Sequence, residues 1–198
     1  MESLQKETVL VEVCEIYHKI SKLDILKPSK DVDSLFIELV RTCIPPSSIN
    51  IVTLPANVQE ISRLEFDILT EHYSALGQAP ERLAFVGSGP MPLTSIVLAT
   101  YHLKDTIFHN YDIDSMANSM ASHLVSSDPD MSRRMVFHTA NIMDVTDELK
   151  EYDVIFLAAL VGMDIDEKVK VIDHLAKYMA PGALRMLRSI TERDERMS

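Results

Sequence analysis

The hydrophobic pattern of the chain is helical up to about residue 77. Apolar residues at 9, 13, 16, 17 and 20 line one face of a 3.6-residue period, and a cleaner stripe runs from Val32 to Cys43 until Pro45 and Pro46 stop it. A third stripe, from about Ala56 to Tyr73, predicts a helix whose apolar face drifts around its axis. These stripes predict a helical N-terminal region over residues 1–77.

From residue 78 onward, short β-rich runs alternate with helical ones. The expected strands are 83–86, 106–111, 135–138, 153–160 and 183–187, and the expected helices are 93–102, 115–124, a short one near Thr146, and 166–178. Helical crossovers of this length predict an α/β fold with a doubly wound, mostly parallel sheet. We therefore expect residues 78–198 to form one Rossmann-like domain that binds its ligand at the carboxyl ends of the strands.

Composition narrows the class of protein. The 198 residues suffice for one domain with a helical appendage, and 30 acidic against 19 basic residues give a formal charge of −11. Such a surface repels phosphate backbones and anionic lipids, which disfavours nucleic acid and membrane partners. The longest apolar run, Val154 to Met163, has ten residues, about half a membrane span. Cys14 and Cys43 indicate core thiols. The N-terminal residues do not have the pattern of a signal peptide, so we expect a cytoplasmic protein.

The loop after the first strand of this domain is the first candidate for chemistry. Gly87-Ser88-Gly89 connects a strand to a helix, and its glycines permit a tight turn and a close backbone approach to a ligand. The third glycine of the dinucleotide fingerprint is absent, which favours a cofactor without a pyrophosphate. The alternative is a glycine turn that only reverses the chain.

Polar residues follow the next two strands. Asp112 comes twenty-three residues after Gly89, close to the offset at which an acid meets the ribose hydroxyls of a nucleoside. The alternative for Asp112 is an ordinary helix cap, a duty for which Asp114 is better placed. Asn141 lies where an adenine edge would be. The spacing fits a nucleoside pocket of the S-adenosylmethionine type, and the expected cofactor-binding residues are Gly87, Ser88, Gly89, Asp112, Ile113, Asn141, Ile142, Ala158 and Leu160.

Other noticeable residues have simpler interpretations. The seven histidines show no metal-site spacing, so we expect no metal centre. Arg133 and Arg134 could hold a substrate carboxylate, but a solvated pair is the favoured interpretation. Tyr17 and His18 could face the pocket, although a tyrosine on an apolar stripe is usually a core residue.

Several long motifs are similar to plant nicotianamine synthases. They are LAFVGSGPMPLTSIVLA at 83–99, FHNYDID at 108–114, HLVSSDPDMSRRM at 123–135, YDVIFLAALVGMD at 152–164 and HLAKYMAPGAL at 174–184, with TCIPPSSI at 42–49 in the helical region. The resemblance implies a transferase that joins the 3-amino-3-carboxypropyl groups of three S-adenosylmethionine molecules into nicotianamine, a chelator in metal homeostasis, and releases methylthioadenosine. It implies no metal in the chemistry.

The chain departs from this family in two places. Between Ile61 and Ser62 the family has several dozen more residues, which help wall the substrate chamber and contain the glutamate and tyrosine usually given catalytic roles. After Ser189 the family continues with further strands, so the edge of the fifth strand is expected to be uncovered and prone to self-association. The catalytic residues of this chain are therefore unknown. Glu65 could substitute as the base, but a lone helical glutamate is more often solvent-facing.

Three functions remain open at this point. The favoured one is nicotianamine synthase, a transferase. The second is a catalytically impaired S-adenosylmethionine-binding variant of the family, and the third is a small-molecule methyltransferase on the same sheet.

Overall fold

The computed structural model describes residues 56–74, 79–158, 161–162 and 164–188, and of residues 56–62 and 74 it describes the backbone alone. All but the first of these residues belong to one compact unit, Asn57–Ser198. The two helices predicted before residue 44 lie outside the described residues, as do both cysteines, Tyr17, His18 and Leu160.

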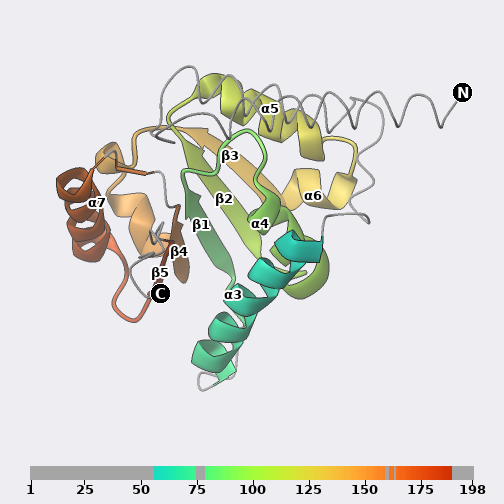
Figure 1. The fold of residues 1–198 in the computed structure, drawn as a ribbon, viewed down its shortest axis with the longest axis horizontal. Coiled ribbons are helices and arrows are strands. Elements are labelled where there is room, and N and C mark those ends of the chain that lie inside the picture. Colours follow the sequence, from blue (N-terminus) through green and yellow to red (C-terminus); the bar gives the residue numbers. More distant parts are fainter. Residues whose placement is uncertain (1–55, 75–78, 159–160, 163, 189–198) are drawn as a thin grey trace, which may run out of the picture. The chain divides into compact units, whose positions relative to one another are not determined.

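The described part of the chain is built on a five-stranded parallel sheet (Figure 1). The strands are β1 (Arg82–Val86), β2 (Ile107–Asp112), β3 (Met135–Thr139), β4 (Val154–Leu157) and β5 (Leu184–Leu187). Their order in the sheet is β3-β2-β1-β4-β5, so the direction of winding reverses between β1 and β4. This confirms the predicted doubly wound fold and puts its topological switch point, where such sheets bind ligands, at the carboxyl ends of β1 and β4.

The fourth strand is shorter than predicted. We expected it to run to Leu160, but β4 ends at Leu157, and Val161 N already donates to Ala158 O in a turn. Among the described residues after the strand, Val161 is apolar for another reason, because it packs against Gly87 of the glycine loop. Burial by a neighbouring loop and burial in a sheet produce the same apolar run in a sequence.

Helices connect the strands, and three of them differ from expectation. The helices and helical turns are α3 (Ala56–Ser74), α4 (Leu93–Val97), the π-helical turn η2 (Leu98–His102), α5 (Ser115–Val125), α6 (Pro129–Arg134), the 3-10 turns η3 (Ile142–Asp144) and η4 (Asp147–Glu151), and α7 (Ile165–Tyr178). The single helix predicted over 93–102 is divided into α4 and η2. The short helix near Thr146 is two 3-10 turns. Helix α6 was missed, although Asp128 caps it and Pro129 opens it, which is a standard start signal.

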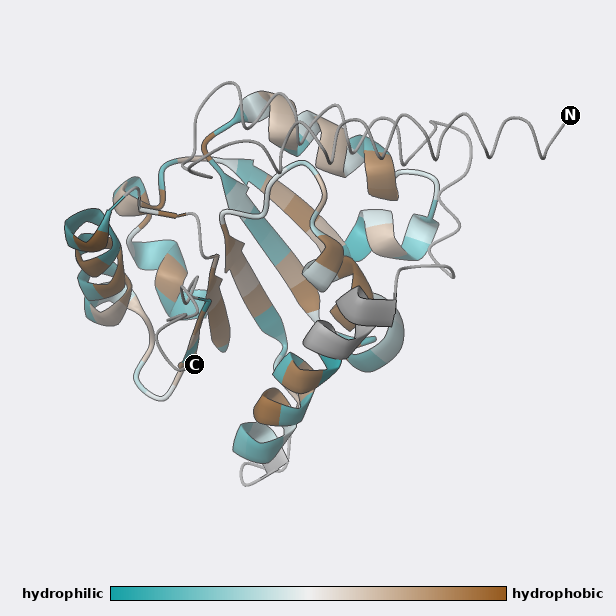
Figure 2. Cartoon of the chain, viewed as in Figure 1, coloured by the Kyte–Doolittle hydropathy of each residue, from teal (hydrophilic) through white to brown (hydrophobic). Residues whose placement is uncertain are grey.

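One face of the sheet carries the hydrophobic core formed with α7, η3 and η4. Val171 and Leu175 of α7 lie four residues apart and pack with Leu149 of η4 onto Ile155 and Leu157 of β4. Figure 2 shows hydrophobic and hydrophilic positions alternating around α7, as expected for a helix with one buried face. Asp164 caps this helix by accepting a hydrogen bond from Glu167 N at 2.8 Å.

Helix α3 runs antiparallel to β4. At its end Tyr73 donates from its hydroxyl to Asp153 O at 2.8 Å, beside the start of β4, and Glu65 reaches Arg188 beyond the end of β5. Among the described side chains of α3, which are those of residues 63–73, Glu65, Leu69 and Tyr73 are buried and Leu64 is exposed. The apolar stripe drifts in the sequence because one buried position holds a charged residue.

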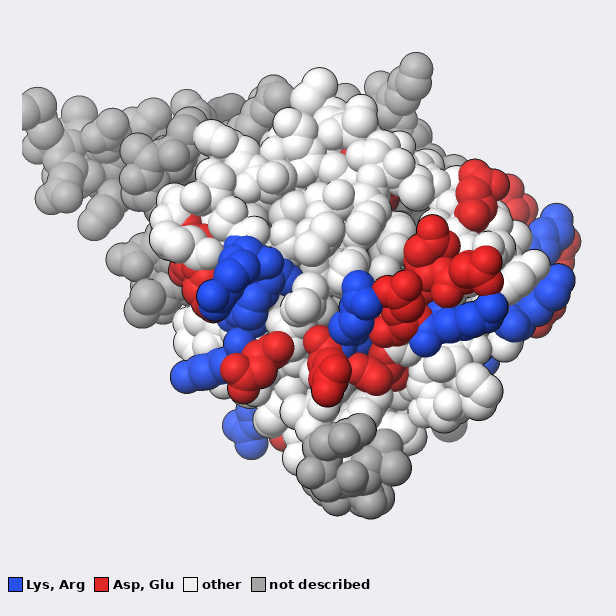
Figure 3. Space-filling model, turned by 180° about the vertical axis from the view of Figure 1, so that it is seen from behind, with Lys and Arg blue, Asp and Glu red and all other residues white. Residues whose placement is uncertain are grey.

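Strand β5 forms one end of the described sheet, as predicted from the sequence. Leu187 is the most exposed residue of this strand, at 47%. Self-association through this edge stays a prediction. Seen from behind, the molecule carries acidic and basic side chains interspersed in one band (Figure 3). Among the described residues, no helix has the length and apolar character needed to cross a membrane.

Candidate functional site

The glycine loop is held against the end of β2. Gly87 N and Ser88 N both donate to Tyr111 O, at 2.8 and 3.1 Å. Gly87 and Gly89 have φ values of +78° and +66°, in the left-handed region that favours glycine. A Cβ on Gly87 would collide with Cγ2 of Val161, whereas a Cβ on Gly89 would meet none of the described residues within 4 Å. The loop is therefore packed on one side and open at Gly89.

Asp112 lies beside this opening. Its Oδ2 accepts a hydrogen bond from Gly89 N at 2.8 Å, and its Oδ1 accepts one from Asp114 N at 2.9 Å. The cap of α5 is Asp114, whose side chain accepts from Met116 N, so Asp112 is not needed for that duty. Each carboxylate oxygen of Asp112 has one amide partner among the described residues, and its further lone pair can accept a hydroxyl group.

The end of β3 lies beside the end of β2. Ala140 N donates to Asp112 O at 3.1 Å, which brings the residues after Ala140 close to Ile113. The Ile113 residue is 76% exposed. Asn141 caps η3 by accepting from Met143 N, and its exposed side chain keeps the amide NH2 group for other partners. The Ile142 side chain is buried in the core, so only its backbone can meet a ligand.

Met143 is a residue that the sequence analysis missed. It is 38% exposed and directly follows Asn141 and Ile142. An exposed apolar residue on each of two neighbouring loops, here Ile113 and Met143, provides surfaces that suit the two faces of a flat aromatic ring.

Two further expected residues lie around the glycine loop. Ala158 N donates to Val86 O at 3.0 Å, which keeps Ala158 next to the loop. Ser88 Oγ is buried and has no hydrogen-bond partner among the described residues. A buried hydroxyl without a partner is unfavourable, so it is typical of a site completed by a ligand or an ordered water. The described residues thus fit a polar ligand at Gly89.

Glu65 is buried and paired, so the expectation of a solvent-facing side chain is wrong. Its two oxygens accept from Nε and Nη2 of Arg188, at 2.6 and 2.8 Å, and Nη2 also donates to Thr94 Oγ1. Helix propensity says nothing about such a partner 123 residues away. The signal that could have found it is a charged residue four positions before Leu69, on the buried face of α3.

An aromatic cluster supports β2 on the α7 face of the sheet. Tyr111 and Tyr152 share a hydrogen bond of 2.6 Å between their hydroxyls, and His109 Nδ1 lies 2.9 Å from His138 Nε2. Burial raises the pKa of both tyrosines, and it lowers the pKa of His109 to about 4, with His138 and Arg82 acting in the same direction. Neither tyrosine is suited to give up its proton near neutral pH.

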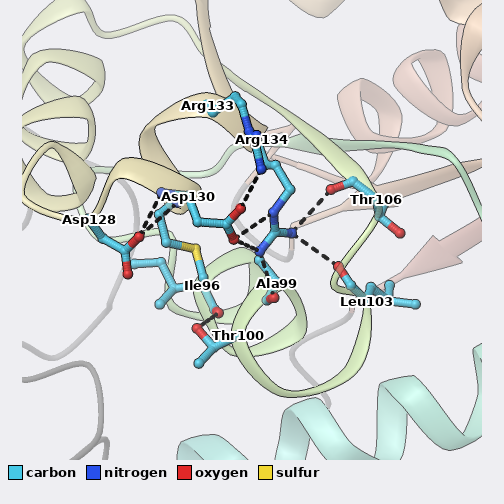
Figure 4. Close-up of polar contacts among 10 residues, drawn as sticks. Ile96, Ala99, Thr100, Leu103, Thr106, Asp128, Asp130, Arg133 and Arg134 are labelled. Carbon is cyan, nitrogen blue, oxygen red and sulfur yellow. Dashed lines mark hydrogen bonds and ion pairs between the residues drawn. The ribbon is translucent and has the colours of Figure 1, made fainter.

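The two adjacent arginines have different environments. Arg133 is exposed, as expected of a solvated residue, but Arg134 is buried, which corrects the prediction (Figure 4). Its guanidinium donates to the carbonyls of Ala99, Leu103 and Thr106 and pairs with Asp130. These carbonyls lie in and after the π-helical turn, where helix carbonyls lack their usual partners. Arg134 is therefore a structural residue.

No group of three or more His, Cys, Asp or Glu side chains that could hold a metal ion occurs among the described residues.

Comparison with known sequences identifies the family. A sequence model described as nicotianamine synthase protein matches residues 1–63 and 55–194. The chain is 50% identical to nicotianamine synthase 3 of Arabidopsis thaliana, covering 93% of this chain and 72% of that protein. It is also 50% identical to nicotianamine synthase of Solanum lycopersicum, covering 91% and 70%.

Comparison with solved structures supports the fold. A putative sarcosine dimethylglycine methyltransferase from Galdieria sulphuraria matches with a TM-score of 0.54 at 15% identity, over 79% of this chain and 58% of that chain. The plantazolicin methyltransferase BpumL matches with a TM-score of 0.51 at 13% identity, over 91% and 58%. At these identities the likeness shows a common fold.

The comparisons also agree with an internal gap. The Arabidopsis alignment has 232 positions but covers 93% of the 198 residues, about 184, which leaves about 48 positions without a residue of this chain. The family match is divided into two parts that meet at residues 55–63, around the junction of Ile61 and Ser62. With half its residues identical over most of its length, and with the fold and loop geometry described above, this chain belongs to the nicotianamine synthase family.

Proposed function

We propose that the carboxyl edge of β1, β2 and β3 binds the nucleoside of S-adenosylmethionine, the substrate from which this family forms nicotianamine. The observation that carries the proposal is the contact between Asp112 Oδ2 and Gly89 N, 2.8 Å long. A carboxylate able to accept ribose hydroxyls therefore lies beside Gly89, where an added Cβ would meet none of the described residues within 4 Å.

The nucleoside is then distributed over three strands. The ribose lies at Asp112, and the adenine lies over Ile113 and Met143 with its polar edge toward the Asn141 amide and the Ile142 backbone. Gly87, Ser88 and Gly89 let the sugar approach the backbone, and Ser88 Oγ gains a polar partner. Ala158 belongs to the same wall. Leu160, the other apolar residue predicted for the site from the sequence, lies outside the described residues.

The chemistry transfers an aminocarboxypropyl group and not a methyl group. The lone pair of an amine nitrogen forms a bond to the carbon next to the sulfonium, the carbon–sulfur bond breaks toward sulfur, and methylthioadenosine leaves as a neutral thioether. The attacking ammonium must first lose its proton to a base. The protein supplies alignment of the amine with that carbon, which is worth up to roughly 7–11 kcal/mol.

Two alternatives have specific support. An impaired S-adenosylmethionine-binding protein is favoured by the gap of about 48 positions in the Arabidopsis alignment. A methyltransferase is favoured by the structural neighbours named above, which are themselves described as methyltransferases. Mass spectrometry after incubation with S-adenosylmethionine separates the three: nicotianamine with methylthioadenosine, neither product, or S-adenosylhomocysteine.

The nucleoside site is tested by changing Asp112. We expect Asp112→Ala to weaken methylthioadenosine binding by about 1.5–3 kcal/mol, because it removes hydrogen bonds to a charged group. Calorimetry of Asp114→Ala is the matched control, since that change removes a helix cap two residues away. The control should lower the free energy of unfolding by about 1 kcal/mol and leave the affinity unchanged. Wild-type affinity in Asp112→Ala would remove this residue from the ribose site.

A further inference from the structure

Arg188 is held rigidly by residues from two helices. Nε donates to Glu65 Oε1 at 2.6 Å, and Nη2 donates to Glu65 Oε2 at 2.8 Å and to Thr94 Oγ1 at 2.5 Å. Glu65 is on α3 and Thr94 is in the first turn of α4. A bidentate guanidinium–carboxylate pair fixes both distance and orientation.

The guanidinium lies at the ligand-binding edge of the sheet. Arg188 N donates to Leu157 O at the end of β4, and the guanidinium carbon lies 5.4 Å from the centre of the Phe85 ring, one residue before the end of β1. Arg188 is therefore at the switch point between β1 and β4, on the face of the sheet that also carries α3 and α4.

One guanidinium nitrogen of Arg188 has no hydrogen-bond partner among the described residues. Glu65 and Thr94 occupy Nε and Nη2, and Nη1 has no hydrogen bond to the described residues. The Arg188 side chain is 34% exposed, whereas that of Glu65 is 10% exposed. The Glu65 carboxylate is thus the buried member of the pair, and the more exposed guanidinium of Arg188 can donate from Nη1 to a ligand.

The direction of the bound nucleoside leads toward Arg188. In the proposed site the adenine lies at β3, the ribose lies at β2, and Gly89 follows β1. The strands are in the order β3-β2-β1-β4, so the 5′ substituent of the ribose continues toward β4. From β2 to β4 is two strand spacings, about 10 Å. That is a suitable length for the aminocarboxypropyl arm beyond the ribose, and its carboxylate is the group that a preorganised arginine binds best.

We propose that Arg188 binds the α-carboxylate of the aminocarboxypropyl group of S-adenosylmethionine, and that Glu65 and Thr94 are the residues that position its guanidinium. This inference rests on the nucleoside site proposed above. It assigns recognition of the transferred group to a part of the sheet edge that the nucleoside does not occupy.

Three ligands separate this role from the nucleoside site. S-adenosylmethionine has the carboxylate and a sulfonium, S-adenosylhomocysteine has the carboxylate without a sulfonium, and methylthioadenosine has neither. We expect Arg188→Gln to weaken binding of the first two about tenfold to a hundredfold, the range for hydrogen bonds to a charged group, and to leave methylthioadenosine within about twofold.

The charge of the ligand provides an internal control. S-adenosylmethionine carries a net positive charge at neutral pH, so removing a distant positive residue would strengthen its binding. A weaker affinity for S-adenosylmethionine in Arg188→Gln, with methylthioadenosine binding retained, is therefore the opposite of the long-range charge effect and indicates direct contact with the carboxylate. The matched control is Arg185→Gln in β5, three residues before Arg188. Arg185 Nη1 donates to Ile172 O of α7, so this change should alter none of the three affinities.

A second variant protects the test against misfolding. Arg188→Gln leaves Glu65 buried without its partner, which is destabilising. The double variant Glu65→Gln with Arg188→Gln removes both charges together, and retained methylthioadenosine binding reports a folded site. Glu65→Gln alone keeps Arg188 and removes only the residue that positions it. The dissociation constant of S-adenosylhomocysteine, divided by that of methylthioadenosine, should therefore rise less in Glu65→Gln than in Arg188→Gln.

The outcomes are distinct. Selective loss of the two carboxylate ligands in both Arg188 variants supports the inference. Equal weakening of all three ligands, or no change in any, overturns it and leaves the nucleoside site standing. Wild-type protein that binds none of the three overturns the nucleoside site, and the role of Arg188 with it.

Discussion

Gly87 and Gly89 have similar backbone angles and different surroundings, and this difference separates stability from binding. The Cβ of an alanine at 87 would collide with Val161, while at 89 it would extend into open space. The left-handed conformation costs an alanine roughly 1–2 kcal/mol at either position.

We expect Gly89→Ala to lower the free energy of unfolding by about 1 kcal/mol and to abolish methylthioadenosine binding, since the new methyl group occupies the approach to the backbone. Gly87→Ala should destabilise the fold by about 2 kcal/mol or more because strain and collision add. Urea unfolding and calorimetry on both variants measure the two effects separately. Normal binding by Gly89→Ala would mean that the ligand does not use this opening.

At the scale of elements, Arg134 connects α6 to the π-helical turn η2. The turn arises because Leu103 N donates to Leu98 O, five residues back, and the carbonyls of Ala99, Leu103 and Thr106 then take their hydrogen bonds from Arg134. An irregular helix end is tolerated in the interior only with such partners.

Replacing Arg134 by methionine should lower the free energy of unfolding by about 3 kcal/mol or more, because several buried carbonyls lose their donor. Arg133→Met is the matched control: its side chain is 77% exposed, and the change should cost less than about 0.5 kcal/mol. Equilibrium unfolding in urea measures both. Equal stabilities of the two variants would show that water replaces the guanidinium.

The aromatic cluster between β2, β3 and η4 makes stability depend on pH. Burial, His138 and Arg82 lower the pKa of His109 from 6.5 to about 4, so the unfolded chain binds a proton in this window that the folded chain does not. The contribution is fully present above pH 6.5 and is lost as the pH falls toward 4. The groups around it are His138, Arg82 and Tyr152, with Glu148 acting on the pKa of His138.

We therefore expect the free energy of unfolding of the wild-type chain to fall from pH 6.5 to pH 4, by at most about 1.4 kcal/mol per pH unit for this one group. His109→Gln should fall less steeply over the same range. His123→Gln, at an exposed position on α5, should reproduce the wild-type slope. Parallel wild-type and His109→Gln curves would show that His109 is protonated in the folded protein.

At the scale of the whole molecule, the internal gap bears on turnover. Joining two or more large substrates needs a walled chamber that excludes water and aligns the amine with the carbon beside the sulfonium. The family segment expected to provide much of that wall has no counterpart around the junction of Ile61 and Ser62.

We expect these 198 residues to bind S-adenosylmethionine and to produce little or no nicotianamine. Inserting the corresponding segment of the Solanum lycopersicum relative between Ile61 and Ser62 should restore formation of nicotianamine and methylthioadenosine. Mass spectrometry of both proteins measures the difference. A rate for the short chain comparable with that of the full-length relative would show that the segment is dispensable.

The fold class, the five strands and the loop of the candidate site can all be predicted from the order of residues along the chain. Alternating β-rich and helical runs define right-handed crossovers, and the Gly87–Gly89 turn and Asp112 follow successive strands, so their meeting at one edge follows from parallel topology alone. The prediction that Asp114 is better placed than Asp112 to cap α5 is confirmed, because a cap lies directly before the helix it caps.

The environments of several charged and apolar residues depend on tertiary contacts and could not be predicted from the sequence. Glu65 and Arg134 have partners far away in the sequence, and a charged side chain in a helix looks the same in sequence whether it is solvated or paired. The pattern up to Leu160 predicts a longer strand than β4, because an apolar residue buried against a loop, as Val161 is against Gly87, looks the same in sequence as one buried in a sheet. Sequence periodicity reports that a position is buried, and the contacts that bury it are set by elements distant along the chain.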